Sequence, residues 1–218
     1  MLNTDTLDTH NKAFFWQWIR SPKEVGAIFP SSSSLAQAMA AQVPICNDGT
    51  VLELGAGTGA ITKALLQAGI RSDQLMVMEK NPSMADTLHQ RFPNLCILQK
   101  DVTRLSRAVH DARAIYDKRE PQPIKTIVSG LPMLLFDSRK QYVILRQAFS
   151  LLAPGGFFIQ FTYGPTPPVS RQVLARLGIK AKRAAFIWRN TPPAAVWKLE
   201  LSPTTIAQST APNSEIRR

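Results

Sequence analysis

From residue 50 onward, short apolar runs alternate with stretches in which apolar residues recur every three or four positions. Short runs are typical of buried strands, and the recurring spacing is typical of helices that bury one face. Strands in this alternation pair in parallel, because each helix carries the chain back to the same edge of the sheet. The pattern predicts an α/β fold with five parallel strands, at residues 50–57, 74–81, 95–102, 124–132 and 156–164.

Glycine and proline residues indicate where helices end. Gly69 closes an expected helix at 60–69, and Pro154 with Gly155 is expected to end a helix that begins at residue 137. Beyond the fifth strand, residues 183–201 indicate two strands joined by a turn, so a terminal antiparallel hairpin completes a sheet of seven strands. Further helices are expected at 26–40, 82–92 and 171–178, and one within 104–123.

The length of 218 residues suits one main domain, which we expect at residues 23–201. The tail at 202–218 is polar and is expected to be disordered. No run approaches the roughly 20 consecutive apolar residues of a membrane-spanning helix, and the polar start is unlike a signal peptide, so a cytoplasmic location is expected. Cys46 and Cys96 lack metal-like spacing, and no metal site is expected.

Positive charge is concentrated in the carboxyl-terminal half of the chain. The formal net charge is +11, and ten lysines and arginines but no acidic residue lie between Asp137 and Glu200. Such an excess indicates a polyanionic partner, either nucleic acid or an anionic membrane surface.

A glycine-rich loop follows the first strand and opens a helix. Gly55, Gly57 and Gly59 permit positive φ and close approach of a ligand, and the helix start offers free N–H groups. The loop predicts a nucleotide-type ligand. Read with Ala60, the same residues also fit the dinucleotide fingerprint, so the loop alone leaves two kinds of cofactor open.

Three carboxylates favour one of the two cofactors. Glu53, Glu79 and Asp101 are expected at the carboxyl edges of adjacent strands, which suits the cationic S-adenosylmethionine better than an anionic dinucleotide. Capping of helices explains any one of them but poorly explains all three. The pattern predicts a class I methyltransferase with a Rossmann-like sheet and the product S-adenosylhomocysteine. The cofactor-binding candidates are Glu53, Gly55, Ala56, Gly57, Thr58, Gly59, Glu79, Lys80, Asp101, Val102, Ser129, Ser32 and Ser33.

Five segments carry a more specific resemblance and keep their order along roughly residues 13–199. They are "FFWQWIRSPKEVGAIFPSSS", "LELGAGTGAIT", "SGLPML", "TYGP" and "FIWRNTPPAAVWKL". Together they resemble the soluble bacterial phospholipid N-methyltransferases, which are similar to the ribosomal RNA adenine dimethylases. The resemblance implies methylation of phosphatidylethanolamine and its mono- and dimethyl derivatives toward phosphatidylcholine. It also implies a peripheral enzyme on the inner face of the bacterial membrane, with no nucleic-acid partner.

The aromatic segment near the amino terminus suits a membrane surface. Phe14, Phe15 and Trp18 share one side of a helix, whereas Trp16 points away from this stripe. An amphipathic helix at 1–22 could lie in the membrane interface, and a helix packed on the core by the same stripe is the alternative. The expected substrate and membrane contacts are Phe14, Phe15, Trp16, Trp18, Arg20, Met133 and Arg189.

Catalytic candidates lie on the loops after the fourth and fifth strands. The Tyr163 phenol could orient an amine, or it could simply pack at a strand end, while the backbone carbonyls of Ser129 and Gly130 could direct the nitrogen. One serine of 31–34 is expected to cap a helix, and others could bind the cofactor or a lipid phosphate. An RNA base methyltransferase is the alternative function, but residues 130–133 lack the polar anchor and stacking ring that such enzymes present.

Overall fold

The computed structural model describes residues 30–45, 48–116, 122–163, 166–188 and 193–202, without the side chains of 30–32 and 115–116. The expected amphipathic helix at 1–22, Arg189 and the tail from residue 203 lie outside the described residues. None of the described helices has the length and apolar character needed to cross a bilayer.

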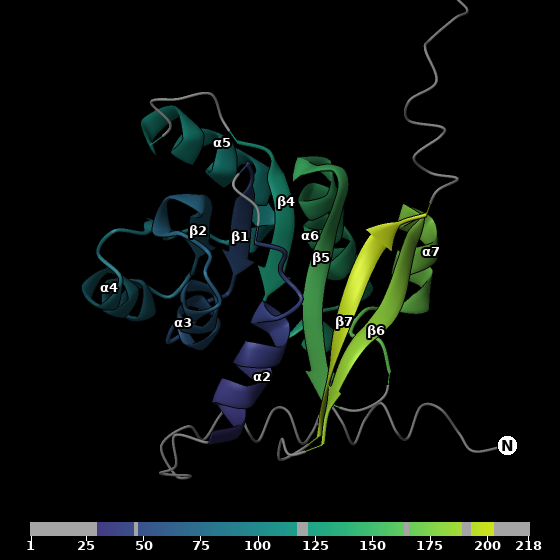
Figure 1. The fold of residues 1–218 in the computed structure, drawn as a ribbon. Coiled ribbons are helices and arrows are strands. Elements are labelled where there is room, and N and C mark those ends of the chain that lie inside the picture. The colour runs from purple at the N-terminus through teal and green to yellow at the C-terminus, as the bar shows by residue number, and fades with distance from the viewer. Residues whose placement is uncertain (1–29, 46–47, 117–121, 164–165, 189–192, 203–218) are drawn as a thin grey trace, which may run out of the picture.

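A seven-stranded sheet forms the centre of the molecule, in the order β3-β2-β1-β4-β5-β7-β6 (Figure 1). The first five strands pair in parallel, and β7 lies antiparallel between β5 and β6. The predicted α/β fold with a terminal antiparallel hairpin is confirmed. The strands are β1 (Thr50–Leu54), β2 (Leu75–Met78), β3 (Cys96–Leu98), β4 (Ile124–Ser129), β5 (Leu152–Tyr163), β6 (Ile179–Ile187) and β7 (Ala194–Leu201).

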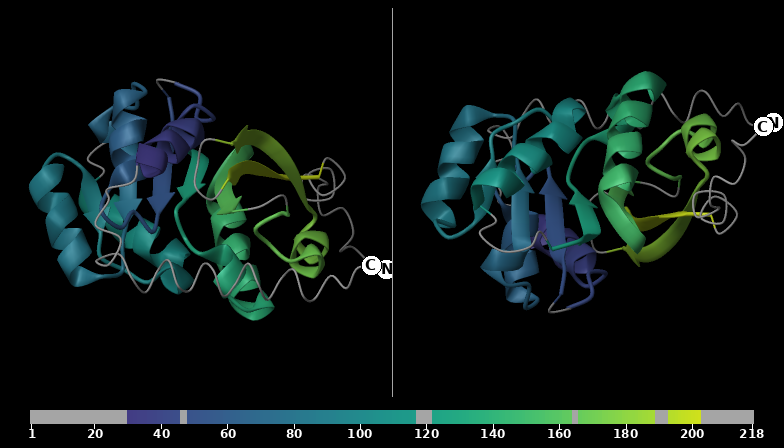
Figure 2. Two further views of the ribbon diagram at one scale, coloured as in Figure 1. Left: turned by 90° about the horizontal axis from the view of Figure 1, so that it is seen from below. Right: turned by 90° about the horizontal axis from the view of Figure 1, so that it is seen from above.

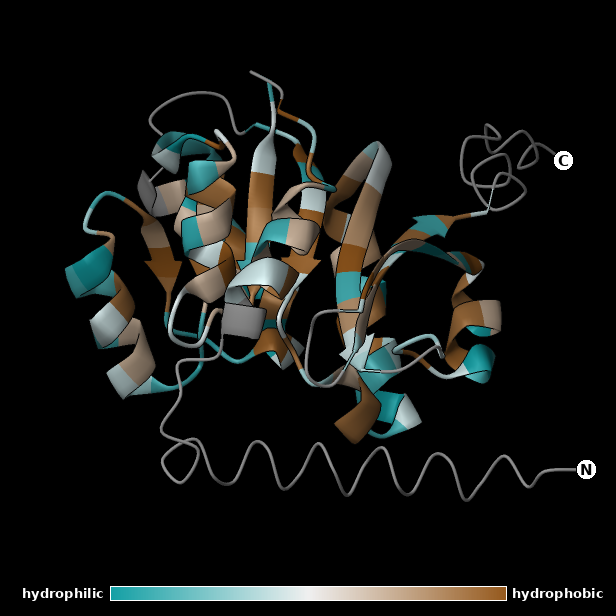
Figure 3. Cartoon of the chain, turned by 60° about the horizontal axis from the view of Figure 1, so that its bottom comes forward, coloured by the Kyte–Doolittle hydropathy of each residue, from teal (hydrophilic) through white to brown (hydrophobic). Residues whose placement is uncertain are grey.

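Helices cover both faces of the sheet (Figure 2). One core cluster joins the sheet to α5 (Leu105–Tyr116), α6 (Ser138–Leu151) and α7 (Arg171–Leu177). The other joins it to α2 (Pro30–Ala40), α3 (Ala60–Gln67) and α4 (Pro82–Arg91). The strands are therefore largely apolar, and polar residues gather on the outward sides of the helices (Figure 3).

Short side chains fix the starts of several helices. The carboxylate of Asp137 accepts a hydrogen bond from the Lys140 backbone N–H at 2.7 Å, and the hydroxyl of Ser170 accepts one from the Val173 N–H at 3.3 Å. The prediction that a serine of 31–34 caps a helix is wrong, because all four serines lie within α2, after Pro30. An N-cap residue must precede the helix, so none of them can fill that position.

The helix before β5 is shorter than the sequence predicted. It ends at Leu151, and Pro154 and Gly155 belong to β5. Ile124 of β4 pairs with Leu152 of β5, but Thr126, two residues later, pairs with Phe157, five residues later. The ladder between the two strands is therefore irregular in this stretch. Pro154 has no N–H for the ladder, and Gly155 takes a positive φ of 76°, which suits a bulge.

Candidate active site

A pocket of about 240 Å³ lies where the loops after β1, β2, β3 and β4 meet. It therefore opens at the carboxyl edge of the parallel strands, the edge at which open α/β sheets bind their ligands. Six predicted site residues line this pocket: Gly55, Glu79, Lys80, Asp101, Val102 and Gly130. Six further lining residues are Met78, Lys100, Leu131, Pro132, Phe136 and Lys140.

The floor of the pocket is formed by backbone in close contact. Gly55 has a φ of 69°, and its N–H donates to the Met78 carbonyl at 2.8 Å. A Cβ on Gly130 would lie 2.7 Å from the Gly55 carbonyl oxygen, which is closer than real Cβ atoms approach. Both glycines are therefore required for the two loops to meet.

Glu79 holds two backbone segments with one carboxylate. Its Oε2 accepts from the Gly57 N–H and its Oε1 from the Asn81 N–H, each at 2.8 Å. The side chain is almost fully buried and lines the pocket. Each carboxylate oxygen has a further lone pair, so Glu79 can hold the loops and accept two ligand hydroxyls.

Glu53 is fully buried on β1, directly behind the glycine loop. The hydroxyl of Thr62 donates to its Oε2 at 2.7 Å, while its Oε1 is buried and has no hydrogen-bond partner among the described residues. Burial raises the pKa of Glu53 to about 7, against the opposing effect of the Thr62 hydrogen bond. A buried carboxylate with an orphaned oxygen requires a cation or a proton.

Asp101 reaches the pocket from beyond β3 rather than from its last residue. The strand ends at Leu98, and Asp101 caps the short 3₁₀ helix Val102–Arg104 through the Thr103 N–H at 2.9 Å. Its Oδ2 lies 2.7 Å from the Lys80 ammonium. The hydrogen bond from Lys80 is the main cause that lowers the pKa of Asp101, so this carboxylate stays ionised.

A second, smaller cavity adjoins the first. Leu131 and Pro132 line both, and the smaller one is completed by residues of the 3₁₀ helix Met133–Leu135 and by Phe161, Thr162 and Tyr163. Its position between the ends of β4 and β5 provides an approach to the larger pocket from the side of Tyr163. The smaller cavity has a volume of only about 20 Å³, so it marks a side of the larger pocket from which a second substrate could approach.

Tyr163 is half-buried, and its ring meets Phe161 edge-on at 5.5 Å between centroids. Burial raises the pKa of its phenol to about 12, so the hydroxyl stays protonated at neutral pH. The hydroxyl can therefore donate or accept a hydrogen bond toward a substrate, but it cannot act as a phenolate base.

The remaining predicted residues take varied positions. The buried hydroxyl of Ser129 accepts from the Leu131 N–H at 3.3 Å, so it stabilises its own loop. Met133 is 1% exposed and belongs to the core, which places its side chain beside the smaller cavity and away from any membrane surface. Ser33 is exposed on α2, and Ala56, Thr58 and Gly59 do not line the larger pocket.

Two lining residues form a contact that no motif indicates. The Lys140 ammonium lies 3.8 Å from the centroid of the Phe136 ring, and both residues belong to the wall opposite the β2 loop. Leu131 and Pro132, by contrast, fall within "SGLPML" and were within reach of sequence reasoning. No group of three or more His, Cys, Asp or Glu residues that could hold a metal occurs among the described residues.

These residues fit S-adenosylmethionine. Glu79 offers acceptors for a ribose and Asp101 offers a further acceptor in the same pocket. Glu53 does not line the pocket, but it is a buried carboxylate close to the glycine loop that a cationic group could neutralise. Gly57 has a φ of 55° and open space beside its Cα, so ligand atoms can approach the backbone there.

Residues 51–156 match the family model of a methyltransferase domain. Over 184 residues the chain is 29% identical to an ornithine lipid N-methyltransferase from Singulisphaera acidiphila, which covers 84% of this chain and 92% of that protein. A ribosomal RNA small subunit methyltransferase A from Streptococcus pneumoniae is 27% identical, across 73% of this chain and 51% of its own length.

Solved structures show the same fold at low sequence identity. The glycopeptide N-methyltransferase MtfA in complex with S-adenosyl-L-homocysteine superposes with a TM-score of 0.56 at 14% identity, covering 83% of this chain and 95% of that one. The CcbJ methyltransferase from Streptomyces caelestis gives 0.56 at 16%, covering 83% and 99%.

The chain has the class I methyltransferase fold, and its cofactor is S-adenosylmethionine. The predictions of this fold and of this cofactor are confirmed. Of the two relatives described above, the ornithine lipid N-methyltransferase is matched over the larger share of both proteins.

Proposed function

We propose that the protein transfers methyl groups from S-adenosylmethionine to the amine of a membrane-lipid headgroup, with phosphatidylethanolamine as the first substrate. The observation that carries the proposal is the near full-length similarity to a lipid N-methyltransferase. The ribosomal RNA relative supports the alternative less well, because the chain spans only about half of its length.

The bound cofactor supplies an electrophilic methyl group on a cationic sulfur. The lipid amine must reach it neutral, with its lone pair in line with the bond that breaks, so positioning and desolvation contribute much of the catalysis. Transfer would leave the neutral product S-adenosylhomocysteine, and the headgroup ammonium would lose its proton to water before each transfer. No strongly basic side chain is required for these steps.

Tyr163 suits the role of orienting the amine. Its phenol is neutral at pH 7 because burial raises the pKa to about 12, and its ring lies in the wall of the smaller cavity. After the first transfer the nitrogen gains methyl groups, and the ring face can then stabilise the growing cation. Gly130 lines the larger pocket beside it and offers its backbone as a second guide for the nitrogen.

The loop after β4 supports a lipid substrate over a flipped RNA base. At the positions where base methyltransferases present a polar anchor and a stacking ring, this chain has Gly130 and Met133, and the Met133 side chain is buried in the core. We also propose that the enzyme works as a peripheral protein on the inner membrane face, with residues 1–22 as one of its membrane contacts.

Radiolabelled cofactor distinguishes the substrates. The enzyme is incubated separately with phosphatidylethanolamine vesicles, with vesicles that contain ornithine lipid, and with ribosomal RNA, and each reaction is extracted into organic solvent. Label in the phosphatidylethanolamine extract supports the proposal. Label only in the ornithine lipid extract would identify ornithine lipid as the substrate instead, the lipid named for the relative. Label in RNA alone refutes both lipid substrates. The Glu53→Ala variant serves as the control without methyl transfer.

A further inference from the structure

The β6–β7 hairpin carries an exposed aromatic pair that has no part in the site described above. Trp188 directly follows β6 and is 79% exposed. Its ring meets the ring of Phe186 edge-on, with 4.5 Å between centroids. Phe186 itself packs against the hydrophobic core, so it supports the exposed indole from below. The exposed indole therefore lies at the first residue after β6, where it contacts a partly buried ring of the strand.

Strand register places this pair at the catalytic edge of the sheet. Tyr163 pairs with Ala194 on β7, and Ala194 pairs in turn with Ile187 on β6. These three residues form one row across the hairpin, and Trp188 is the next residue beyond that row. Neighbouring strands lie about 4.8 Å apart, so β6 is about 10 Å from β5 along this row. Phe186 packs against the core cluster on one face of the sheet and Tyr163 against the cluster on the other face, so the two side chains share this edge of the sheet but not a face. A surface that covers the edge itself would contact Trp188 and lie about 10 Å from the end of β5.

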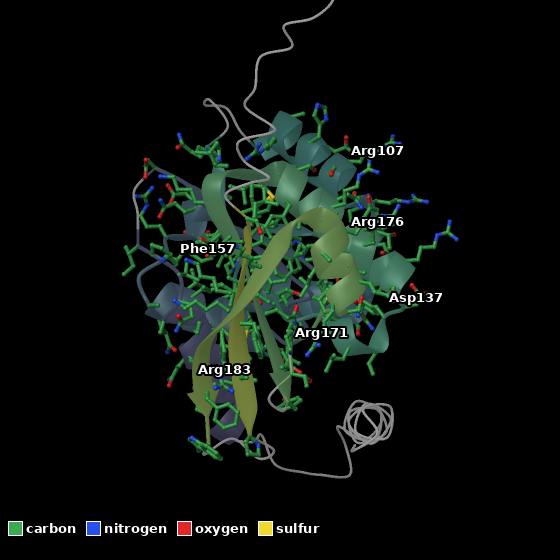
Figure 4. All side chains as sticks on the ribbon, turned by 90° about the vertical axis from the view of Figure 1, so that its right-hand side faces the viewer. Arg107, Asp137, Phe157, Arg171, Arg176 and Arg183 are labelled. Atoms are coloured by element: carbon green, nitrogen blue, oxygen red, sulfur yellow. The ribbon has the colours of Figure 1, made fainter. Side chains whose placement is uncertain are left out.

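Positive charge accompanies the aromatic rings. The Arg183 guanidinium lies 5.7 Å from the centroid of the Phe186 ring. β6 contains no acidic residue, and its exposed lysines, Lys180 and Lys182, lie toward the start of the strand, about 20 Å or more from Trp188. Figure 4 shows Arg183 on the hairpin, apart from Arg107 and Arg176 on the helical side of the molecule. The hairpin thus combines an indole with cations, which suits the headgroup region of an anionic bilayer.

We propose that Trp188, Phe186 and Arg183 form a membrane contact, the hairpin anchor, that rests on an anionic phospholipid bilayer and presents headgroups to the adjacent cavity. The proposal extends the proposed function, because it names the surface by which the enzyme meets its lipid. The indole of Trp188 lies at headgroup depth, and Arg183 binds lipid phosphate. One short anchor holds a bilayer reversibly, so contact at residues 1–22 would act together with it.

Vesicle sedimentation with the full-length chain tests the hairpin anchor. The vesicles contain phosphatidylglycerol and phosphatidylethanolamine, and Trp188→Ala is expected to weaken partitioning about tenfold, the effect of removing one large apolar side chain from the interface. The matched control is Ile45→Ala. Ile45 is 68% exposed but lies near Gly69, which precedes β2 and so belongs to the opposite edge of the sheet. Its partitioning should equal that of the wild type.

A fluorescence arm reports on the indole directly. In the Trp16→Phe, Trp18→Phe variant, the remaining tryptophans are Trp188 and Trp197, and Trp197 is only 7% exposed. Brominated lipids in the vesicles should therefore quench mainly the Trp188 emission. Quenching by less than a tenth at saturating lipid would overturn the proposal, as would equal partitioning of Trp188→Ala and the wild type.

The outcomes also separate this proposal from the proposed function. Cofactor binding by calorimetry should be unchanged in Trp188→Ala, and so should methyl transfer to phosphatidylethanolamine dispersed in detergent, since neither requires a bilayer. Loss of activity on vesicles alone supports the hairpin anchor. Loss of RNA binding without loss of vesicle binding would assign the surface to nucleic acid and overturn it. If the wild type transferred no methyl group to phosphatidylethanolamine in detergent, the proposed function would be refuted. The hairpin anchor would then still be decided by the sedimentation of Trp188→Ala.

Discussion

The buried carboxylate of Glu53 makes the stability of the ligand-free protein depend on pH. Burial raises its pKa from 4.5 to about 7. Between these values the folded state holds a proton that the unfolded state has lost, so the free energy of unfolding falls as pH rises. From pH 5 to pH 8 the loss amounts to about 2.5 kcal/mol, and it is complete above the folded-state pKa.

Glu53→Gln removes this titration and retains the shape of the side chain. Its amide oxygen can still accept the hydrogen bond from Thr62, which is 2.7 Å long in the wild type. The free energy of unfolding, measured by urea titration with circular dichroism at each pH, should be higher in the variant than in the wild type at pH 8. At pH 5 the two proteins should agree within about 1 kcal/mol. A difference that stays constant from pH 5 to pH 8 would refute the reasoning.

Cofactor binding should reverse the advantage of the variant. If the ionised Glu53 faces a cationic group, S-adenosylmethionine should bind the variant between tenfold and about a hundredfold more weakly at pH 8, because a charge-assisted partner is lost. Binding to the wild type at pH 6 should release a proton, which calorimetry in buffers of different ionisation enthalpy measures. Equal affinities of both proteins would place the cationic group elsewhere.

Three further outcomes follow from the site and the charge pattern. Gly130→Ala should lower cofactor affinity by at least tenfold in calorimetry, because its Cβ would lie 2.7 Å from the Gly55 carbonyl oxygen; unchanged affinity would mean that the loops can separate without consequence. Asp101→Asn should change the free energy of unfolding by less than about 1 kcal/mol in chemical denaturation, because its ion pair with Lys80 is partly exposed. The same variant should bind the cofactor more weakly in calorimetry. Removal of residues 1–22 should weaken sedimentation with anionic vesicles at low salt, and sedimentation equal to that of the full chain would exclude this segment as a membrane contact.

Local patterns were sufficient to predict the glycine loop and its carboxylates. Glu53, Gly55 and Glu79 lie next to strand ends, where the sequence period and the turn residues fix their position within a residue or two. Asp101 was harder, because β3 has only three residues and the chain continues beyond it before reaching the pocket. The strand length depends on pairing with β2, which no local pattern reports.

Residues brought to the site by tertiary folding were not predictable. Phe136 and Lys140 reach the pocket because the 3₁₀ helix Met133–Leu135 turns the chain back and α6 then begins at its rim. Their spacing has no periodic signature. The same turn buries Met133, which the sequence predicted as a substrate or membrane contact. Local sequence patterns therefore located the glycine loop, while the opposite wall of the pocket depended on packing.

The carboxylate of Glu79 holds the backbone amides of Gly57 and Asn81 before any ligand binds. The glycine loop and the amino-terminal end of α4 are therefore already ordered in the free protein, and binding of the cofactor requires little further ordering of the chain. Association should then proceed in a single fast phase with no slow rearrangement, and discrimination between fresh donor and spent product would depend on the charge at sulfur.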